Sequence, residues 1–204
     1  MHLADGVLSA PIIAATYGIT IAGMAIAAKG IKDEDIPKIS LMAGTFFAVS
    51  LISIPVPPTS VHPLLCGLIG IILGKRAPWA FFPALLLQAL LFRHGGLTAL
   101  GANTIMLSIP AYLSYLMYNL MPIKKAAVKG GIVGAVSVMM TVAILIILLA
   151  LTDARFASGD FSVVQIAVVG HVPVMIGEAI LTAFAVQFLD KNKKGWISSE
   201  RIVA

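Results

Sequence analysis

The chain begins with Met1 and His2, and this pair carries three consecutive nitrogen donors. They are the α-amine of Met1, the backbone amide of His2 and the His2 imidazole. Amine and amide close one chelate ring on a metal ion, and amide and imidazole Nδ1 close a second. This planar set leaves one in-plane position, which a second histidine can fill. Square-planar nitrogen coordination is typical of Ni(II) and Cu(II), and imidazole also binds cobalt and zinc.

Three further histidines are candidates for that position: His62, His94 and His171. The topology derived below places all four histidines in the outer half of the protein. A packed or interfacial histidine is the alternative for each of them, since imidazole is amphipathic. Cys66 is either a soft ligand or a buried packing residue.

Two other polar residues belong to the same candidate site. Asn103 either hydrogen-bonds a ligand histidine or caps the helix that follows it. Glu178 lies two helical turns after His171, on one face of the last helix. A carboxylate inside a membrane is costly, so we expect it to tie this helix to the bundle through a histidine or the backbone, in preference to binding the metal directly.

The composition places these residues in a membrane protein. Hydrophobic residues make up 59% of the 204 positions and charged residues 11%, with a mean hydropathy of +1.01. Soluble domains have ~45–50% apolar and ~25% charged residues. The length suits one helical bundle, so we expect a single all-α membrane domain over 1–204.

Apolar runs separated by polar, Pro or Gly segments predict about seven transmembrane helices. They lie at 11–28, 39–54, 63–74, 78–92, 103–121, 130–151 and 163–189. Five are long enough to cross a bilayer, which takes ~17–25 residues. The third and fourth are short and are expected either to be buried by their neighbours or to re-enter the membrane.

The basic residues predict the orientation of these helices. Twelve of the 14 Lys and Arg lie in the loops after the first, third and fifth helices or after the last helix; Arg93 and Arg155 lie on the other side. This places the C-terminus in the cytoplasm and the N-terminus outside, folded back into the bundle. The net charge of +5 then reflects topology and not nucleic-acid binding. A cleaved signal peptide is not expected, because the start carries Asp5 and no basic residue.

Two outer loops are expected to position the site. The proline-rich "PVPPTSVHP" predicts a stiff loop in which Pro63 starts a helix and His62 caps it; a simple helix breaker is the alternative. The stretch "RHGGLTALGANT" predicts a re-entrant loop that lines a cavity. Ser9 before Ala10 and Pro11 predicts the cap of the first helix.

The segments "MHLADGVLSAP", "SVHP", "HGGLTALGANT" and "EAILT" together resemble a known family. They are similar to the CbiM/NikM-type substrate-binding (S) components of energy-coupling-factor (ECF) nickel and cobalt transporters, and the likeness covers essentially the whole chain. It implies a square-planar site made by the Met1 amine, the His2 amide and imidazole, and His62. His94, Asn103, His171 and Glu178 would then surround the site.

The resemblance also implies the setting of such a protein. It would be a multi-pass protein of a prokaryotic cell membrane that works with a transmembrane coupling subunit and two cytoplasmic ATPase subunits, and in some cases with a small accessory membrane protein. The chain has no Walker motif of its own, which agrees with an external energy source. Ni2+ or Co2+ would be the transported substrate.

The function expected is therefore capture of Ni(II) or Co(II) from outside for ATP-driven uptake. Two alternatives are a cobalt-specific subunit serving cobalamin synthesis and an ion-coupled secondary carrier of divalent metals. The secondary carrier would need more intramembrane carboxylates than Glu178 alone. An intramembrane enzyme is not expected, because the chain has no HExxH motif and no convincing Ser/His pair.

Overall fold

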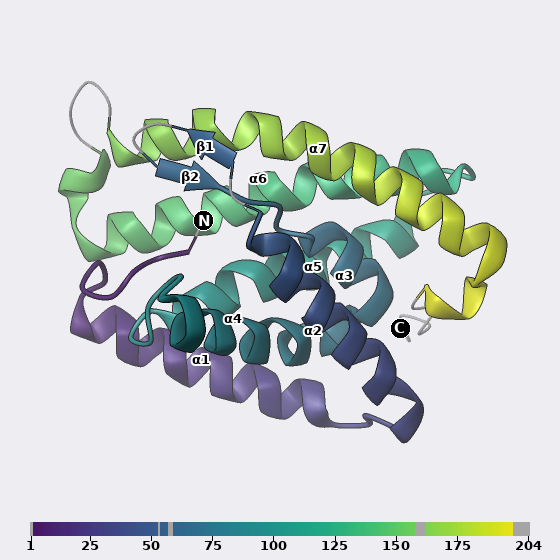
Figure 1. Ribbon diagram of the computed structural model, residues 1–204, viewed down its shortest axis with the longest axis horizontal. Helices are drawn as coiled ribbons and strands as arrows, with labels where there is room; N and C mark the ends of the chain where they lie inside the picture. Colours follow the sequence, from purple (N-terminus) through teal and green to yellow (C-terminus); the bar gives the residue numbers. More distant parts are fainter. Residues whose placement is uncertain (1, 53, 57–58, 158–161, 198–204) are drawn as a thin grey trace.

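Helices dominate the architecture, as the hydrophobic pattern predicts (Figure 1). The computed structural model describes residues 2–52, 54–56, 59–157 and 162–197. In this part of the chain it forms seven α-helices and one two-stranded hairpin. Their bounds are α1 Ala10–Ala28, α2 Ile36–Ser50, β1 Ile54–Val56, β2 Thr59–Val61, α3 Cys66–Leu73, α4 Pro78–Phe92, α5 Leu100–Leu120, α6 Ala126–Thr152 and α7 Val163–Asn192.

Several helices begin as their sequences suggest. Proline stands in the first turn of α1, α2 and α4, where its missing N–H costs no helical hydrogen bond. Ser9 precedes α1 but makes no side-chain capping bond, so the capping prediction is wrong in that detail. Ser162 does cap α7, and its hydroxyl accepts from the Gln165 amide at 3.2 Å.

The seven predicted helices are present, but fewer of them than expected are both long and apolar enough to count as membrane spans on their own. Three helices, α1, α6 and α7, are long and apolar enough to cross a bilayer, or four spans are present if α3 and α4 together count as one. The α3–α4 pair bends by 119°. The prediction that the second helix is long enough to cross is wrong, because α2 has 15 residues and the chain turns into the hairpin after it.

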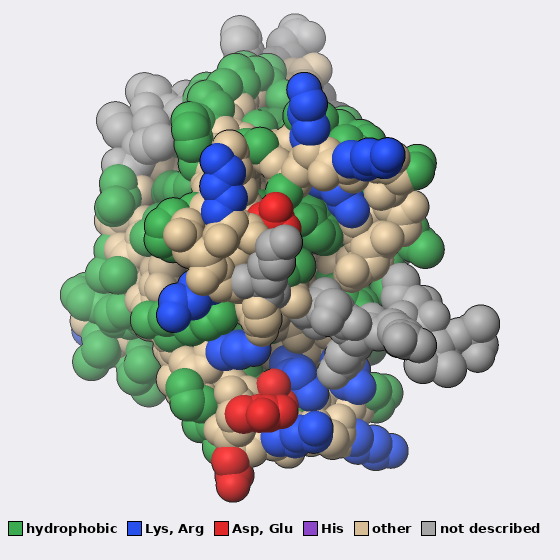
Figure 2. Space-filling model, turned by 90° about the vertical axis from the view of Figure 1, so that its right-hand side faces the viewer, with side chains coloured by type: hydrophobic (Ala, Val, Ile, Leu, Met, Phe, Trp, Pro, Cys, Tyr) green, Lys and Arg blue, Asp and Glu red, His purple; other side chains and the backbone are tan. Residues whose placement is uncertain are grey.

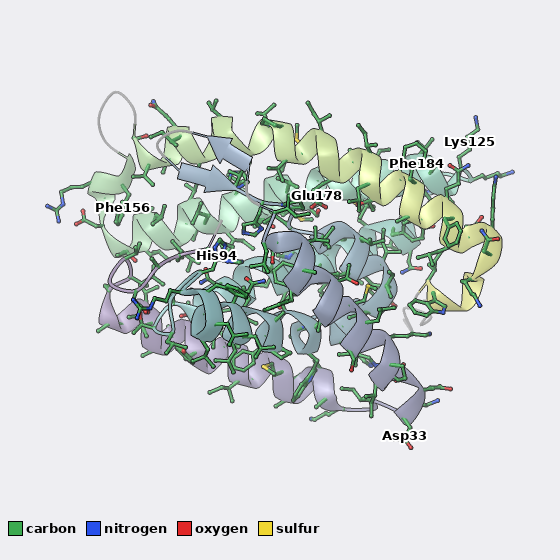
Figure 3. The ribbon with its side chains drawn as sticks, in the orientation of Figure 1. Asp33, His94, Lys125, Phe156, Glu178 and Phe184 are labelled. Atoms are coloured by element: carbon green, nitrogen blue, oxygen red, sulfur yellow. The ribbon has the colours of Figure 1, made fainter. Side chains whose placement is uncertain are left out.

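The bundle is arranged around α3, whose residues are all buried. The helices α6 and α7 run side by side along one side of the molecule, and α1 lies at the opposite side (Figure 1). Large apolar side chains on α1 and α7 remain exposed, among them Ile21, Val169 and Phe184, and Phe184 points away from the bundle in Figure 3. Such all-round hydrophobicity is expected of helices in contact with lipid.

The basic loops gather at one end of the molecule. Figure 2 shows Lys and Arg side chains crowded over this end, and Figure 3 places Asp33 and Lys125 there. Here Arg76 contacts the Asp35 carboxylate at 3.0 Å and donates to the Gly30 carbonyl, which ties the α3–α4 bend to the loop after α1. Phe156 and His94 lie nearer the other end (Figure 3).

Candidate metal centre

Three histidines that are far apart in the sequence meet in the fold. His2, His62 and His94 each offer a ring nitrogen, and these nitrogens all lie within 4.8 Å of one another. The ring centroids of His2 lie 4.6 Å from His62 and 4.8 Å from His94. The N-terminal segment, the turn before α3 and the loop after α4 supply one histidine each, so the site exists only in the folded bundle.

Asn103 holds the N-terminal segment in place. Its Oδ1 accepts from the Leu3 amide at 2.8 Å and its Nδ2 donates to the Leu3 carbonyl at 3.0 Å. The side chain of Leu3 is buried beneath. The two sequence-based alternatives, a bond to a histidine and a helix cap, are therefore both wrong. Asn103 pairs with the backbone N–H and C=O of Leu3, the residue after His2.

A second contact fixes the same segment at Asp5. Its Oδ1 accepts from the Thr98 amide at 2.7 Å and from the Thr98 hydroxyl at 2.6 Å. Gly96 makes this approach possible, because a Cβ there would lie 2.3 Å from the Asp5 amide nitrogen. Asp5, Gly96 and Thr98 were not singled out as site residues. The turn pair Asp-Gly and the "GGLT" stretch were the available signals.

His62 lies in a turn that precedes α3 and does not cap it. The helix begins at Cys66, after Leu65 in a left-handed conformation with φ of 54°. The prediction that Pro63 starts the helix is therefore wrong. The Nδ1 of His62 lies 2.9 Å from the Pro63 carbonyl. A carbonyl only accepts, so this contact places the proton on Nδ1 and leaves the lone pair on Nε2.

Four ring nitrogens of this cluster are buried without a hydrogen-bond partner among the described residues: Nε2 of His62, Nε2 of His94 and both ring nitrogens of His2. Buried polar atoms in native proteins are usually paired. Several unpaired imidazole nitrogens within 4.8 Å of one another are a donor set that suits a transition-metal ion.

The electrostatics favour neutral imidazoles. All three histidines lie outside the helices, and burial lowers the pKa of His2 and His62 well below the ordinary 6.5. Burial also lowers the pKa of His94, which is half-buried. Neutral imidazole is the form that binds a metal.

The other candidate residues do not belong to this group of three histidines. His171 is buried in α7, and its Nδ1 lies 2.6 Å from the Ala167 carbonyl. Glu178 contacts the backbone of the turn before α3, which is the tie to the bundle that was expected of it. Cys66 is buried and its Sγ lies 3.7 Å from the Thr141 hydroxyl, so it packs in the core. Met1 lies outside the described residues.

The two outer loops have different structures. The proline-rich stretch forms the hairpin β1–β2, in which Ile54 pairs with Val61. The first part of the glycine-rich stretch, 93–99, is a loop that contacts the N-terminal segment, and α5 begins at Leu100. Whether this loop re-enters the membrane stays a prediction.

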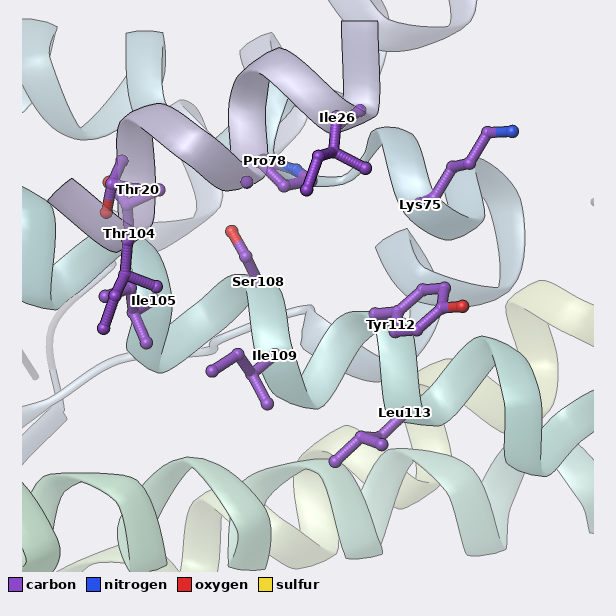
Figure 4. A pocket seen from close by; sticks show the side chains of 13 residues that line it. Thr20, Ile26, Lys75, Pro78, Thr104, Ile105, Ser108, Ile109, Tyr112 and Leu113 are labelled. Atoms are coloured by element: carbon purple, nitrogen blue, oxygen red, sulfur yellow. The ribbon is translucent and has the colours of Figure 1, made fainter. Parts of the chain in front are cut away.

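A groove on the molecule is separate from the histidine cluster. A groove of about 360 Å³ between α1 and α5 is lined mainly by apolar side chains, with Ser108 and Tyr112 among them (Figure 4). None of the histidines lines it. Its lining offers few metal donors, so the histidine cluster is the candidate functional site.

Several known proteins are similar to this chain in sequence or in fold. The family described as "Cobalt uptake substrate-specific transmembrane region" matches residues 2–196. The "Cobalt transport protein CbiM" of Sorangium cellulosum is 33% identical over 100% of this chain and 97% of its own length. The "Fused nickel transport protein NikMN" of Rhodobacter capsulatus is 32% identical over 53% of this chain and 33% of its own length. A crystal structure of a transition metal transporter superimposes with a TM-score of 0.76 at 25% identity, covering 94% of this chain and 93% of that chain.

Proposed function

Because the chain belongs to the family of cobalt-uptake substrate-specific transmembrane proteins, we propose that it captures Ni(II) or Co(II) from outside the cell for uptake. It is a multi-pass membrane component of cobalt or nickel transport, of the CbiM/NikM type, and not an enzyme. The observation that carries the proposal is the convergence of His2, His62 and His94 within 4.8 Å.

The proposed ligand set is planar and made of nitrogen. The Met1 amine, the His2 amide and the His2 imidazole supply three corners, and His62 supplies the fourth through Nε2. The fixed Nδ1 proton of His62 supports this role, because it leaves the Nε2 lone pair free for a metal. His94 is a partly exposed residue of the loop after α4. We propose that it lies beside the plane of the four ligands, next to the ion.

Nickel is the slightly better fit to a planar nitrogen set, and cobalt is the alternative substrate. Cobalt capture would make the protein a subunit that serves cobalamin synthesis. An ion-coupled secondary carrier is supported less well, since Glu178 is the one acidic residue among the buried side chains of α1, α6 and α7 that the structure describes.

The proposed partners are those of an ECF transporter. They are a transmembrane coupling subunit, two cytoplasmic ATPase subunits and, in addition, a small accessory membrane protein. The relative from Rhodobacter capsulatus supports the accessory protein, because it is a fused nickel transport protein of which this chain matches only part.

Calorimetric titration of the purified protein with Ni(II) tests the proposed site. His62→Ala should weaken binding at least ~100-fold, since it removes a direct ligand whose loss exceeds the ~10–100-fold cost of losing an outer partner. Addition of two alanines before Met1 should weaken Ni(II) binding as strongly, because the α-amine of the chain then lies farther from the His2 amide. Asn119→Ala is the control and should leave binding unchanged, because Asn119 lies in α5 outside the proposed site and its side chain donates to the Tyr115 carbonyl one turn away.

The spectrum of the bound ion tests the geometry. Four nitrogens in a plane make Ni(II) diamagnetic and yellow. An octahedral absorption spectrum, or wild-type affinity in both the His62→Ala and the extended protein, would overturn the proposed ligand set. Competition between Ni(II) and Co(II) on the same protein then ranks the two substrates.

A further inference from the structure

Glu178 stands where a charge is expensive to keep. It lies near the middle of α7, one of the membrane-spanning helices, with 2% of its surface exposed. Figure 3 shows it in the centre of the bundle. Acidic residues at such positions are rare and usually have a function. The ligand set proposed above does not use it.

The contacts of this carboxylate are with one short piece of backbone. Oε1 accepts from the Leu64 amide at 2.6 Å and from the Leu65 amide at 2.8 Å. Oε2 is buried and makes no hydrogen bond among the described residues. Both bonds connect residues more than 110 positions apart, so they join α7 to the turn before α3.

That turn is a piece of backbone that needs such support. Leu65 has a φ of 54°, a left-handed backbone conformation that is unfavourable for residues with a side chain. The amides before and at the start of a helix also lack partners within the helix. The Glu178 carboxylate meets both needs, because it pairs two of these amides and holds the turn in its uncommon shape.

His62 belongs to the same turn. Its Nδ1 lies against the Pro63 carbonyl, and the next amide along the chain, that of Leu64, is the first one that Glu178 grips. The peptide that orients the imidazole is thus the peptide whose N–H the carboxylate holds. We therefore expect a shift of Glu178 to move the His62 ring, whose centroid lies 4.6 Å from that of the His2 ring.

The position of Glu178 is itself fixed. The α7 backbone approaches α6 so closely that a Cβ on Gly134 would lie 2.5 Å from the Glu178 carbonyl oxygen. The side chain therefore starts from a defined point in the bundle. Glu178 does not belong to the group of side chains that come within ligand distance of one another at the metal centre.

We infer that Glu178 is a positioning residue for metal capture: through the Leu64 and Leu65 amides it holds His62 in place and couples α7 to the metal site. This inference rests on the proposed function, because it takes His62 as a ligand. It predicts that loss of the carboxylate acts on metal affinity only through His62.

A double-mutant cycle tests this directly, with Ni(II) as the titrant and the full chain in detergent. Glu178→Ala should weaken Ni(II) binding by ~10–100-fold, as loss of an outer partner of a ligand does. Glu178→Gln keeps a carbonyl acceptor for the two amides and should therefore retain part of the Ni(II) affinity that Glu178→Ala loses. In the His62→Ala background, Glu178→Ala should cause no further loss. The Glu178→Ala protein should also show the altered Ni(II) spectrum of the His62→Ala protein.

Thr182→Val is the matched control, because Thr182 is a fully buried polar residue one turn further along α7. It should keep wild-type affinity. The inference is overturned if Glu178→Ala binds as wild type, if its effect adds fully to that of His62→Ala, or if Thr182→Val weakens binding equally. If Glu178→Ala does not fold, the same cycle with Glu178→Gln decides. Wild-type affinity of His62→Ala would remove His62 from the proposed ligand set, whereas weakened binding of His62→Ala with wild-type affinity of Glu178→Ala would overturn this inference alone, so the two failures are distinguishable.

Discussion

At the residue scale, the candidate centre is built from neutral donors kept out of water. Burial accounts for the low pKa of His2, and the absence of protein partners for its ring nitrogens, among the described residues, leaves them available. An imidazole prepared in this way binds a metal without first losing a proton. The same burial lowers the stability of the metal-free folded protein when the pH falls.

That cost gives a pH prediction. In the unfolded chain His2 titrates near 6.5, and in the folded protein its pKa lies well below this value. As pH falls through 6.5 the unfolded state takes up a proton that the folded state does not. The free energy of unfolding of the metal-free protein should therefore decrease, by up to about 1.4 kcal/mol per pH unit for this group.

Thermal unfolding of the purified protein between pH 7.5 and pH 5.5, as nominal test conditions of about one unit either side of the ordinary histidine pKa, measures this effect. The His2→Gln protein should show a smaller decrease in Tm over the range than the wild type. Equal decreases in the two proteins would mean that His2 is not buried as described.

At the element scale, the N-terminal segment is inserted into the bundle and is not a free tail. Asn103 pairs with both backbone groups of Leu3, and Thr98 pairs with Asp5. These contacts lie at the start of α5 and in the loop before it. The segment therefore keeps His2 in place only as long as the 93–99 loop and α5 keep their present arrangement.

Replacing Asn103 by Ala tests this element. The change removes two hydrogen bonds from the backbone N–H and C=O of Leu3, each bond worth about 1 kcal/mol, and leaves both groups unpaired. Ni(II) affinity should fall by about 10–100-fold, the typical loss for an outer contact of a metal site. Asn119→Ala is the control, because the Asn119 side chain donates to the Tyr115 carbonyl one turn away on the same helix, and the Ni(II) affinity of this variant should not change. Equal affinity in the two variants would show that the segment docks without Asn103.

The elements also show what could be predicted from the sequence. The seven helices follow from runs of apolar residues, which are local signals. The pairing of Asn103 with Leu3 joins residues 100 positions apart, and the grip of Glu178 on Leu64 joins residues 114 apart. No local pattern encodes such contacts. The left-handed Leu65 was missed for the same reason, since its conformation depends on a carboxylate from another helix.

At the scale of the whole molecule, the two ends differ in charge and in chemistry. The basic loops share one end (Figure 2), and the histidine cluster is built from segments that lie toward the other. Positive residues favour the cytoplasmic side. The asymmetry therefore predicts that metal enters from outside on the histidine side and leaves toward the basic end.

Cysteine labelling in intact cells tests this orientation. Cys66 is buried and is replaced by Ala to give a background without thiols. A cysteine at Arg155, in the exposed α6–α7 connection, should react with a membrane-impermeant maleimide in intact cells. A cysteine at Lys125, in the connection between α5 and α6, should react only after the membrane is permeabilised. The reverse pattern would place the histidine cluster on the cytoplasmic side, and capture from outside would then be impossible for the metal site as it is built.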